Sequence, residues 1–155
     1  MSKFTKIISS GSYLPEKILT NRELEGIVDT TDKWITERTG IKERRVSSHD
    51  ETSVDMAYQA SIDAINKSGL KKDEIGAIFL ATCTPERKFP STAVLLQNRL
   101  NIKNAFSVDL NAACTGFVYA LDIAKKYIES KQVKYALVVG TEKITSLLDW
   151  TDRNT

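Results

Sequence analysis

The chain has 155 residues, of which 41% are hydrophobic and 27% are charged, and these values are ordinary for a globular protein with one hydrophobic core. The net charge of +2 is too small to indicate nucleic acid as a partner. No apolar run approaches the roughly 20 residues of a membrane span, and the first residues lack the pattern of a signal peptide. We therefore expect a cytoplasmic protein with neither a membrane nor a nucleic-acid partner.

The first 50 residues combine short predicted elements. A strand is expected over residues 3–9. The segment Thr20-Asn21-Arg22-Glu23 has the pattern of a capping box and predicts a short helix to about Val28. A second helix is expected from Thr31 or Asp32 to Arg38, because Gly40 follows it as a typical C-terminal residue.

Residues 51–140 are more regular. Capping residues and helical spacing predict helices over residues 53–68, 91–100 and 114–130, and continuous apolar runs predict strands over residues 77–83, 105–109 and 135–140. Strands of this kind are buried on both faces and run parallel beneath helices. The fold class is therefore α/β, and ligands are expected at the carboxyl ends of the strands. The loops of interest are residues 82–90, residues 110–114 and the segment from residue 141 onward.

The middle of these loops contains a cysteine. In Asn111-Ala112-Ala113-Cys114-Thr115-Gly116-Phe117 a strand ends, small residues form a turn, and a helix is expected to begin at Cys114 or Thr115. A helix N-terminus favours an anion, and the thiolate is the nucleophilic form of cysteine. Cys114 is thus a candidate nucleophile, although a small buried core residue would fit the same pattern.

The remaining cysteine and the histidine carry no comparable pattern. Cys83 ends a predicted strand without a following helix, so we interpret it as a packed thiol. No Cys-x-x-Cys or Cys/His cluster occurs, so no metal site is predicted. His49, the only histidine, lies in a polar segment before a predicted helix and is interpreted as a surface residue.

Several motifs together resemble the β-ketoacyl-acyl-carrier-protein synthase III family, the condensing enzymes that initiate fatty acid synthesis. The resemblance covers essentially the whole chain. Its motifs are Gly11-Ser12-Tyr13-Leu14-Pro15, Asp32-Lys33-Trp34-Ile35, Arg38-Thr39-Gly40-Ile41, Phe89-Pro90-Ser91, Ala112-Ala113-Cys114-Thr115-Gly116-Phe117, Lys134-Tyr135-Ala136-Leu137-Val138-Val139-Gly140 and Thr151-Asp152-Arg153. The implied fold is thiolase-like, with a mixed, mostly parallel sheet and covering helices, as one of two pseudo-duplicated halves.

The resemblance implies a two-step reaction. Cys114 accepts an acyl group from acetyl-CoA or another short acyl-CoA. Malonyl-acyl-carrier-protein then loses carbon dioxide, and its carbanion attacks the acyl-cysteine. The substrate is a CoA thioester, and no cofactor or metal is implied. The decarboxylating His and Asn of the family lie in a C-terminal half that is absent from residues 1–155. The isolated chain is therefore expected to lack condensing activity, and the full-length enzyme is expected to be a homodimer.

The resemblance also implies roles for six further residues. Trp34 and Arg38 match residues that bind CoA, Thr30 and Thr39 lie near the same ligand, and Arg153 matches another CoA-contacting arginine, although Asn154 follows it where the family often has Gly. From the residues alone, Trp34 would be interpreted as a core residue of a short helix. Phe89 matches a residue that reaches into the acyl pocket of the dimer partner, and its alternative is an ordinary loop aromatic.

Two other functions fit the sequence. The chain could be a truncated, non-enzymatic module that binds CoA or dimerises. It could also belong to a related acyltransferase of a polyketide or other lipid pathway that shares the cysteine motif. The loop Cys83-Thr84-Pro85-Glu86-Arg87 differs from the small, polar loop of many relatives, and it is expected to alter the pocket wall and the choice of acyl primer.

Overall fold

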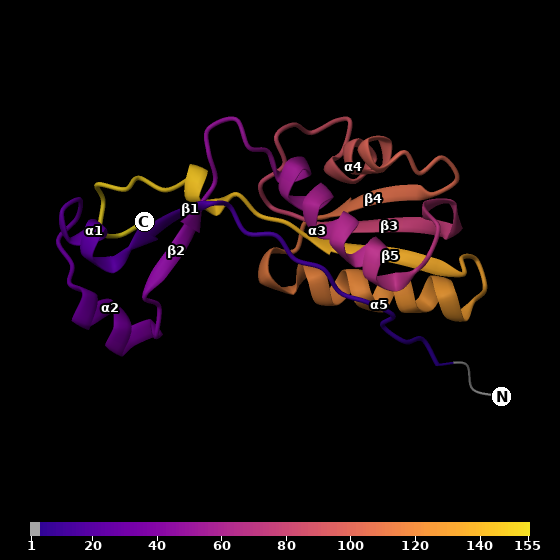
Figure 1. Ribbon diagram of the computed structural model, residues 1–155, viewed down its shortest axis with the longest axis horizontal. Coiled ribbons are helices and arrows are strands. Elements are labelled where there is room, and N and C mark those ends of the chain that lie inside the picture. Colours follow the sequence, from indigo (N-terminus) through magenta and orange to yellow (C-terminus); the bar gives the residue numbers. More distant parts are fainter. Residues whose placement is uncertain (1–3) are drawn as a thin grey trace. The chain divides into compact units, whose positions relative to one another are not determined.

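The computed structural model describes residues 4–155, and Figure 1 shows the course of the chain. The chain forms two compact units. The larger unit contains the N-terminal segment up to Tyr13 together with Thr52–Glu142, and the smaller unit contains Leu14–Glu51 and Lys143–Thr155. The last 13 residues thus belong with the early part of the chain, an association that no local sequence pattern predicts.

The larger unit is built on a three-stranded parallel sheet in the order β4-β3-β5. The strands are β3 (Ile75–Ala81), β4 (Phe106–Leu110) and β5 (Tyr135–Gly140). Ala81 pairs with both Leu110 and Gly140, so all three strands end at the same level. The predicted parallel sheet is confirmed, and its three C-terminal loops begin side by side.

Helices cover both faces of this sheet. On one face, Ile78 and Leu80 of β3 are fully buried in a cluster with side chains of α3 (Ser53–Ser68) and α4 (Thr92–Leu100). On the other face, Phe79 is buried in a second cluster with α5 (Gly116–Glu129). Successive side chains of a strand point to opposite faces, which explains why β3 is apolar at nearly every position. The result is the three-layered α/β arrangement seen in Figure 1.

The larger unit also contains two short 3₁₀ turns, η1 (Lys72–Glu74) and η2 (Ala113–Thr115). The predicted helix limits are mostly confirmed by their caps. Thr52 caps α3, Gly69 ends that helix at a φ of 70°, and the Ser91 hydroxyl accepts a hydrogen bond from the Val94 amide at the start of α4. The strand β3 runs two residues earlier than predicted, since it begins at Ile75 and ends at Ala81. Residue 83 therefore lies in the loop rather than in the strand.

The smaller unit contains an antiparallel pair of strands, β1 (Lys17–Thr20) and β2 (Glu43–Val46), with helices α1 (Asn21–Glu25) and α2 (Asp32–Thr39) and a 3₁₀ turn, η3 (Ile144–Ser146). The predicted capping box at Thr20 is confirmed, as is the left-handed Gly40 after α2. The helix α1 is shorter than predicted. The strand pair was not predicted, because both strands have only four residues and β2 is mostly charged, so they lack the apolar pattern that identifies longer strands.

The predicted strand over residues 3–9 is wrong for the residues that the structure describes, and Lys3 lies outside them. Residues 4–13 contain no strand. The segment instead lies against α3, where the Ser9 hydroxyl donates to the Ala64 carbonyl at 2.8 Å and the Ser12 amide donates to Asp63 at 3.3 Å. Phe4 and Ile7 are 88% and 77% exposed, so these apolar side chains are not buried among the described residues.

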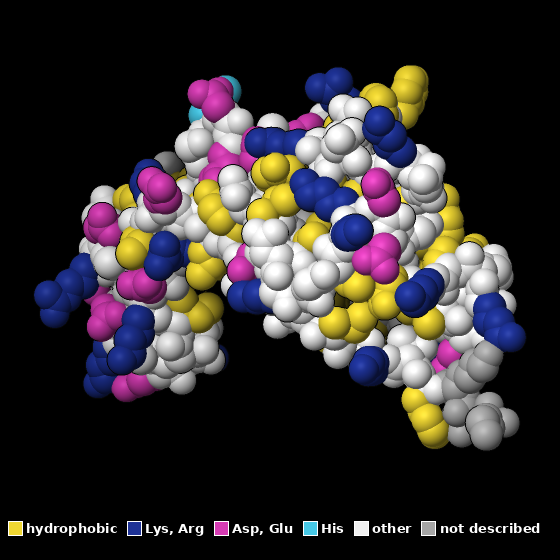
Figure 2. Space-filling view, turned by 45° about the vertical axis from the view of Figure 1, so that its right-hand side comes forward, with side chains coloured by type: hydrophobic (Ala, Val, Ile, Leu, Met, Phe, Trp, Pro, Cys, Tyr) yellow, Lys and Arg dark blue, Asp and Glu magenta, His cyan; other side chains and the backbone are white. Residues whose placement is uncertain are grey.

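A groove of about 800 Å³ lies in the larger unit between this N-terminal segment, α3, α5 and β5. Figure 2 shows hydrophobic side chains gathered on one face of the molecule, with Lys and Arg side chains around them. Val118 and Tyr119 of α5 are also more than half exposed. None of the helices in residues 4–155 is both long enough and apolar enough to cross a bilayer.

Candidate functional site

Cys114 lies in the loop after β4, where the C-terminal ends of the three strands come together. It is exposed and sits in η2, between the end of β4 and the start of α5. The residue before it, Ala113, has a φ of 44°, in the left-handed region that residues other than glycine rarely adopt. That conformation costs about 1–2 kcal/mol and is typical of functional sites, where the surrounding structure enforces it. The turn therefore presents the thiol to solvent on a fixed backbone.

Small residues allow this turn. A Cβ atom on Gly116 would lie only 3.1 Å from the Ala81 Cβ atom, so the glycine lets α5 begin directly against the end of β3. The Thr115 amide and hydroxyl both donate to the Ala112 carbonyl, at 3.2 and 2.8 Å. The helix α5 begins two residues after Cys114, which is slightly later than predicted. The predicted sequence of strand, tight turn and helix is otherwise confirmed.

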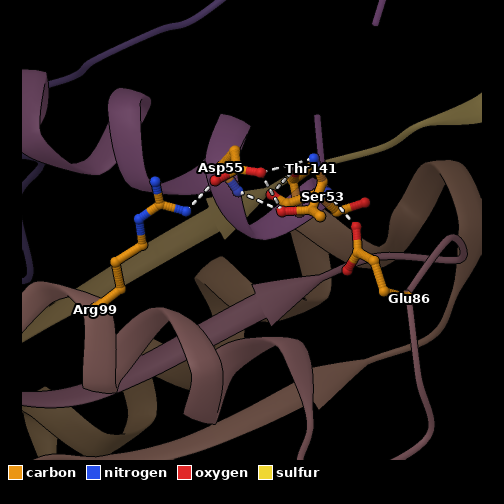
Figure 3. A network of polar contacts seen from close by, with 6 residues as sticks. Ser53, Asp55, Glu86, Arg99 and Thr141 are labelled. Atoms are coloured by element: carbon orange, nitrogen blue, oxygen red, sulfur yellow. Dashed lines mark hydrogen bonds and ion pairs between the residues drawn. The ribbon is translucent and has the colours of Figure 1, made fainter. Parts of the chain in front are cut away.

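Buried Ser53 ties the neighbouring loops together, as Figure 3 shows. Its hydroxyl donates to the Thr84 carbonyl at 2.9 Å in the loop after β3, and its carbonyl accepts from the Thr141 hydroxyl at 3.0 Å after β5. The Glu86 carboxylate accepts from the Ser53 amide. The start of α3 thus holds two of the three strand-end loops. Ser53 was predicted only as part of a helix cap, and its long-range partners have no signal in the sequence.

Asp55 extends this network toward α4, where it pairs with Arg99 (Figure 3). Burial of Asp55 would by itself raise the pKa of its carboxyl group. Hydrogen bonds from the Thr52 hydroxyl and amide, together with the Arg99 guanidinium, outweigh that effect and lower the pKa of Asp55 to about 2. The carboxylate is therefore charged at neutral pH, and it links the two helices on this face of the sheet.

Phe89 lies in the loop after β3. It is 85% exposed and precedes Pro90 through a cis peptide bond. It packs little against its own unit, and this exposure is consistent both with a contact to a dimer partner and with an ordinary loop aromatic. An exposed phenylalanine in a short loop is available to a binding partner.

The smaller unit gathers three of the predicted CoA-binding residues. Trp34 is 45% exposed, and the guanidinium carbons of Arg38 and Arg153 lie 5.5 and 4.9 Å from the centre of its ring. Both distances are within the range of cation–π contact. Arg153 thus joins Trp34 and Arg38, which lie 119 and 115 positions earlier, in one cluster of an indole and two positive charges. Such a cluster can stack an aromatic ring and pair with phosphate groups.

The two predicted threonines take less direct places. The Thr39 hydroxyl donates to the Ile35 carbonyl at 2.8 Å and accepts from the Ile41 amide at 3.1 Å, so it is engaged in ending α2. Thr30 is half-buried beside Asp29, whose carboxylate lies 3.7 Å from the Arg153 guanidinium. Thr30 is therefore near the cluster in sequence and structure, whereas Thr39 has a structural task.

Asn21 is a residue that the sequence reading missed. It is 1% exposed, and its side-chain amide donates to Asp32 at 2.8 Å and to the Ile41 carbonyl at 2.7 Å, while its oxygen accepts from Arg44 at 2.7 Å. These bonds join the start of α2 to its end and to β2. Asn21 therefore orients the helix that carries Trp34 and Arg38. A buried asparagine has no signature in a single sequence.

His49 is a surface residue, as predicted. Its side chain is fully exposed, and its Nδ1 atom lies 3.0 Å from Asp50. Across the part of the chain that the structure describes, no group of three His, Cys, Asp or Glu side chains is arranged to hold a metal ion.

The chain resembles known proteins along nearly its whole length. A family model described as 3-oxoacyl-[acyl-carrier-protein (ACP)] synthase III matches residues 108–155, which include Cys114 and Arg153. The β-ketoacyl-[acyl-carrier-protein] synthase III of Aquifex aeolicus is 52% identical over 151 residues, covering 97% of this chain and 48% of that protein. This chain belongs to the β-ketoacyl-[acyl-carrier-protein] synthase III family. It corresponds to an N-terminal part of such a protein and spans about half the length of these relatives.

Solved structures of the family have the same fold. The crystal structure of 3-oxoacyl-[acyl-carrier-protein] synthase III from Aquifex aeolicus superimposes with a TM-score of 0.91 at 50% identity, over 98% of this chain and 49% of that one. The priming β-ketosynthase of the R1128 polyketide pathway has a TM-score of 0.94 at 37% identity, over 98% of this chain and 46% of that one. The predicted thiolase-like class is therefore confirmed.

Proposed function

We propose that this chain supplies the nucleophile and the CoA-binding residues of a β-ketoacyl-[acyl-carrier-protein] synthase III that initiates fatty acid synthesis. The observation that carries the proposal is the exposed Cys114 thiol on a strained turn before α5. A cysteine that served only to pack the core would be buried.

The first half-reaction follows from this position. The Cys114 thiolate attacks the thioester carbonyl of acetyl-CoA or another short acyl-CoA. A sulfur–carbon bond forms, the bond to the CoA sulfur breaks, and CoA leaves as a thiolate that takes a proton from solvent. The Cys114 amide is among the first N–H groups of a helical turn, which have no partner within the turn. It is therefore a suitable donor to the oxyanion that forms during the attack.

CoA itself is bound through the smaller unit. Trp34 stacks on the adenine ring, and the Arg38 and Arg153 guanidinium groups neutralise phosphate. Their placement around one exposed indole supports this assignment, and we assign Thr30 to the same ligand because it follows Asp29, which contacts Arg153. The hydroxyl of Thr39 is already engaged, so we assign it the support of α2 rather than a ligand contact.

The second half-reaction needs more than this chain. Malonyl-acyl-carrier-protein is decarboxylated by a His and an Asn that the family carries beyond the region matched here. We propose that the partners of the complete enzyme are acyl-CoA and malonyl-acyl-carrier-protein. We also propose that it needs no cofactor and acts in the cytoplasm. Residues 1–155 alone are expected to stop at the acyl-enzyme.

Intact mass spectrometry of the chain after incubation with acetyl-CoA tests the nucleophile. One acetyl adduct should appear, and peptide mapping should place it on Cys114 and not on Cys83, which serves as an internal control. Cys114→Ala should abolish the adduct. An adduct that persists in this variant would reject Cys114 as the nucleophile. Condensation of the acyl group with malonyl-acyl-carrier-protein by the chain alone would contradict the proposal that it stops at the acyl-enzyme.

The likeness to the R1128 priming β-ketosynthase supports a second candidate, in which the enzyme primes polyketide synthesis with a different acyl group. A series of acyl-CoA substrates of increasing length distinguishes the two. Fastest acylation by acetyl-CoA supports fatty acid initiation, and fastest acylation by a longer or branched acyl-CoA supports the second candidate.

We also propose that the complete enzyme is a homodimer in which Phe89 reaches the acyl pocket of the other subunit. Its 85% exposure leaves the ring free for such a contact. Sedimentation of the full-length protein and of Phe89→Ser should show a dimer that the substitution weakens. A wild-type monomer at all concentrations would contradict this assignment.

A further inference from the structure

The three strand-end loops around Cys114 are joined by side chains that the proposed chemistry does not use. Glu142, two residues after β5, accepts a hydrogen bond from the Cys83 amide at 2.8 Å and another from the Thr84 hydroxyl at 2.7 Å. Both carboxylate oxygens are thus engaged by the loop after β3. This pairing holds the backbone amide of half-buried Cys83 and the side chain of the residue that follows it.

Cys83 continues the connection to the loop after β4. Its thiol donates to the Asn111 side-chain oxygen at 3.1 Å. Asn111 is the first residue after β4 and stands three positions before Cys114. A run from Glu142 through Cys83 to Asn111 therefore crosses all three loops at the level where the strands end.

The turn that carries Cys114 begins without a side-chain cap of its own. Its first residue, Ala112, provides no side-chain cap, and Ala113 adopts a positive φ. Thr115 fixes the turn from its far end through the Ala112 carbonyl. The contact between Cys83 and Asn111 provides a side-chain support at the near end of the turn. A thiol that only filled space would not need a hydrogen-bonding partner at this position.

We propose that Cys83 is a positioning residue for the acylation of Cys114. Its thiol holds Asn111, and Asn111 in turn fixes the entry to the strained turn, so that the nucleophile is presented in one orientation. This inference rests on the proposed function of Cys114. It replaces the interpretation of Cys83 as a packed thiol by that of a donor with a defined task.

The size of the effect follows from the chemistry of the contact. A thiol is a weak donor, so its hydrogen bond contributes little to stability, less than about 1 kcal/mol. Misplacement of a reacting group by up to about 1 Å can nevertheless slow a reaction by about 10-fold to 100-fold. Cys83 should therefore affect the rate of acylation much more than the free energy of unfolding.

The test compares the wild-type chain with Cys83→Ala, Cys83→Ser and Asn111→Ala. The limiting rate of acetyl transfer from acetyl-CoA to Cys114 is followed by mass spectrometry. Cys83→Ala and Asn111→Ala should each slow it by about 10-fold, with an unchanged half-saturating concentration of acetyl-CoA. Cys83→Ser keeps a donor of similar size and should restore the rate to within about 3-fold of wild type. The double variant Cys83→Ala/Asn111→Ala should be no slower than either single variant, because both remove one contact.

Alkylation of Cys114 by iodoacetamide, quantified on the Cys114 peptide, separates positioning from a general structural defect. This small reagent needs no oxyanion site, so its rate should change by less than about 2-fold in all variants. Three outcomes would overturn the inference: equal acylation rates in wild type and Cys83→Ala, a defect in Cys83→Ser as large as in Cys83→Ala, or additive effects in the double variant. Failure of wild type itself to acylate Cys114 would reject the proposed function and with it this inference, and that result is distinct from the other three.

Discussion

The Asp109 carboxylate accepts hydrogen bonds from the backbone amides of Thr92 and Ala93, at 2.8 and 2.6 Å. Asp109 is in β4, and the two amides are the first of α4. The strand that leads to Cys114 is thus bonded to the start of a helix that lies 16 to 17 residues earlier in the chain. The negative charge also lies at the positive end of the helix dipole.

Replacement of Asp109 by Ala should therefore destabilise the protein. Both buried amides lose a charged acceptor, and the expected loss in the free energy of unfolding is about 2–3 kcal/mol. Urea denaturation followed by circular dichroism measures it. Asp73→Ala removes an exposed carboxylate and should change stability by less than about 0.5 kcal/mol. Equal stabilities of the two variants would contradict the capping role of Asp109.

Asp55 should make the stability depend on acid pH. Its pKa is lowered to about 2 from an ordinary value of 3.8, so the folded state binds a proton less readily than the unfolded chain. The stabilisation is present above pH 3.8 and is lost as the pH falls toward 2. Because the Asp55 side chain is 31% exposed, solvent screening reduces the contribution to about 1 kcal/mol.

Denaturation at several pH values between about 5 and 2 tests this contribution. Wild type should lose about 1 kcal/mol more than Asp55→Asn over that range, because the variant has no carboxyl group to protonate. Asp73→Asn serves as the control and should follow the wild-type curve. Parallel curves for wild type and Asp55→Asn would show that the network at the start of α3 has no effect on acid stability.

Gly11 should not tolerate a side chain. A Cβ atom there would lie 2.3 Å from the Ala60 carbonyl oxygen and 2.4 Å from the Ala64 amide nitrogen, both backbone atoms of α3. The N-terminal segment would have to move away from the helix, at an expected cost of about 1–3 kcal/mol. Gly26→Ala is the matched control, since its Cβ atom would meet only the Glu23 carbonyl at 3.5 Å. Thermal unfolding should show a lower midpoint for Gly11→Ala alone.

Trp34 should contribute most to CoA binding. Stacking of a base on an aromatic side chain contributes about 1–3 kcal/mol, so Trp34→Ala should weaken the binding of CoA by about 10-fold. Arg38→Gln and Arg153→Gln should also weaken it, and their effects should shrink at high salt because they act on phosphate charge. Isothermal titration with CoA measures the three affinities. Lys33→Gln, on the same helix as Trp34, is the control. An unchanged affinity in Trp34→Ala would place CoA elsewhere.

Much of the site was predictable because its signals are local. Small residues between an apolar run and a helix identify the turn at Cys114, and Thr52, Ser91 and Gly40 mark helix ends through interactions with neighbours in sequence. Strand β3 could be recognised by its continuous apolar run, since both of its faces are buried. Such features depend on the chemistry of a few adjacent residues, and a single sequence contains them.

Other parts were decided by tertiary structure alone. The pairing of β1 with β2, the gathering of Arg153 onto Trp34 and the buried contacts of Asn21 join residues that are distant in the chain. Cys83 illustrates the difference best. By itself it is a small thiol after a strand, and only the meeting of three loops gives it Asn111 as a partner and Glu142 as a support. The sequence determines that a cysteine follows β4 in a turn of small residues, whereas the packing of the strand ends determines what holds that turn in place, because hydrogen bonds between loops depend on geometry that no local pattern encodes.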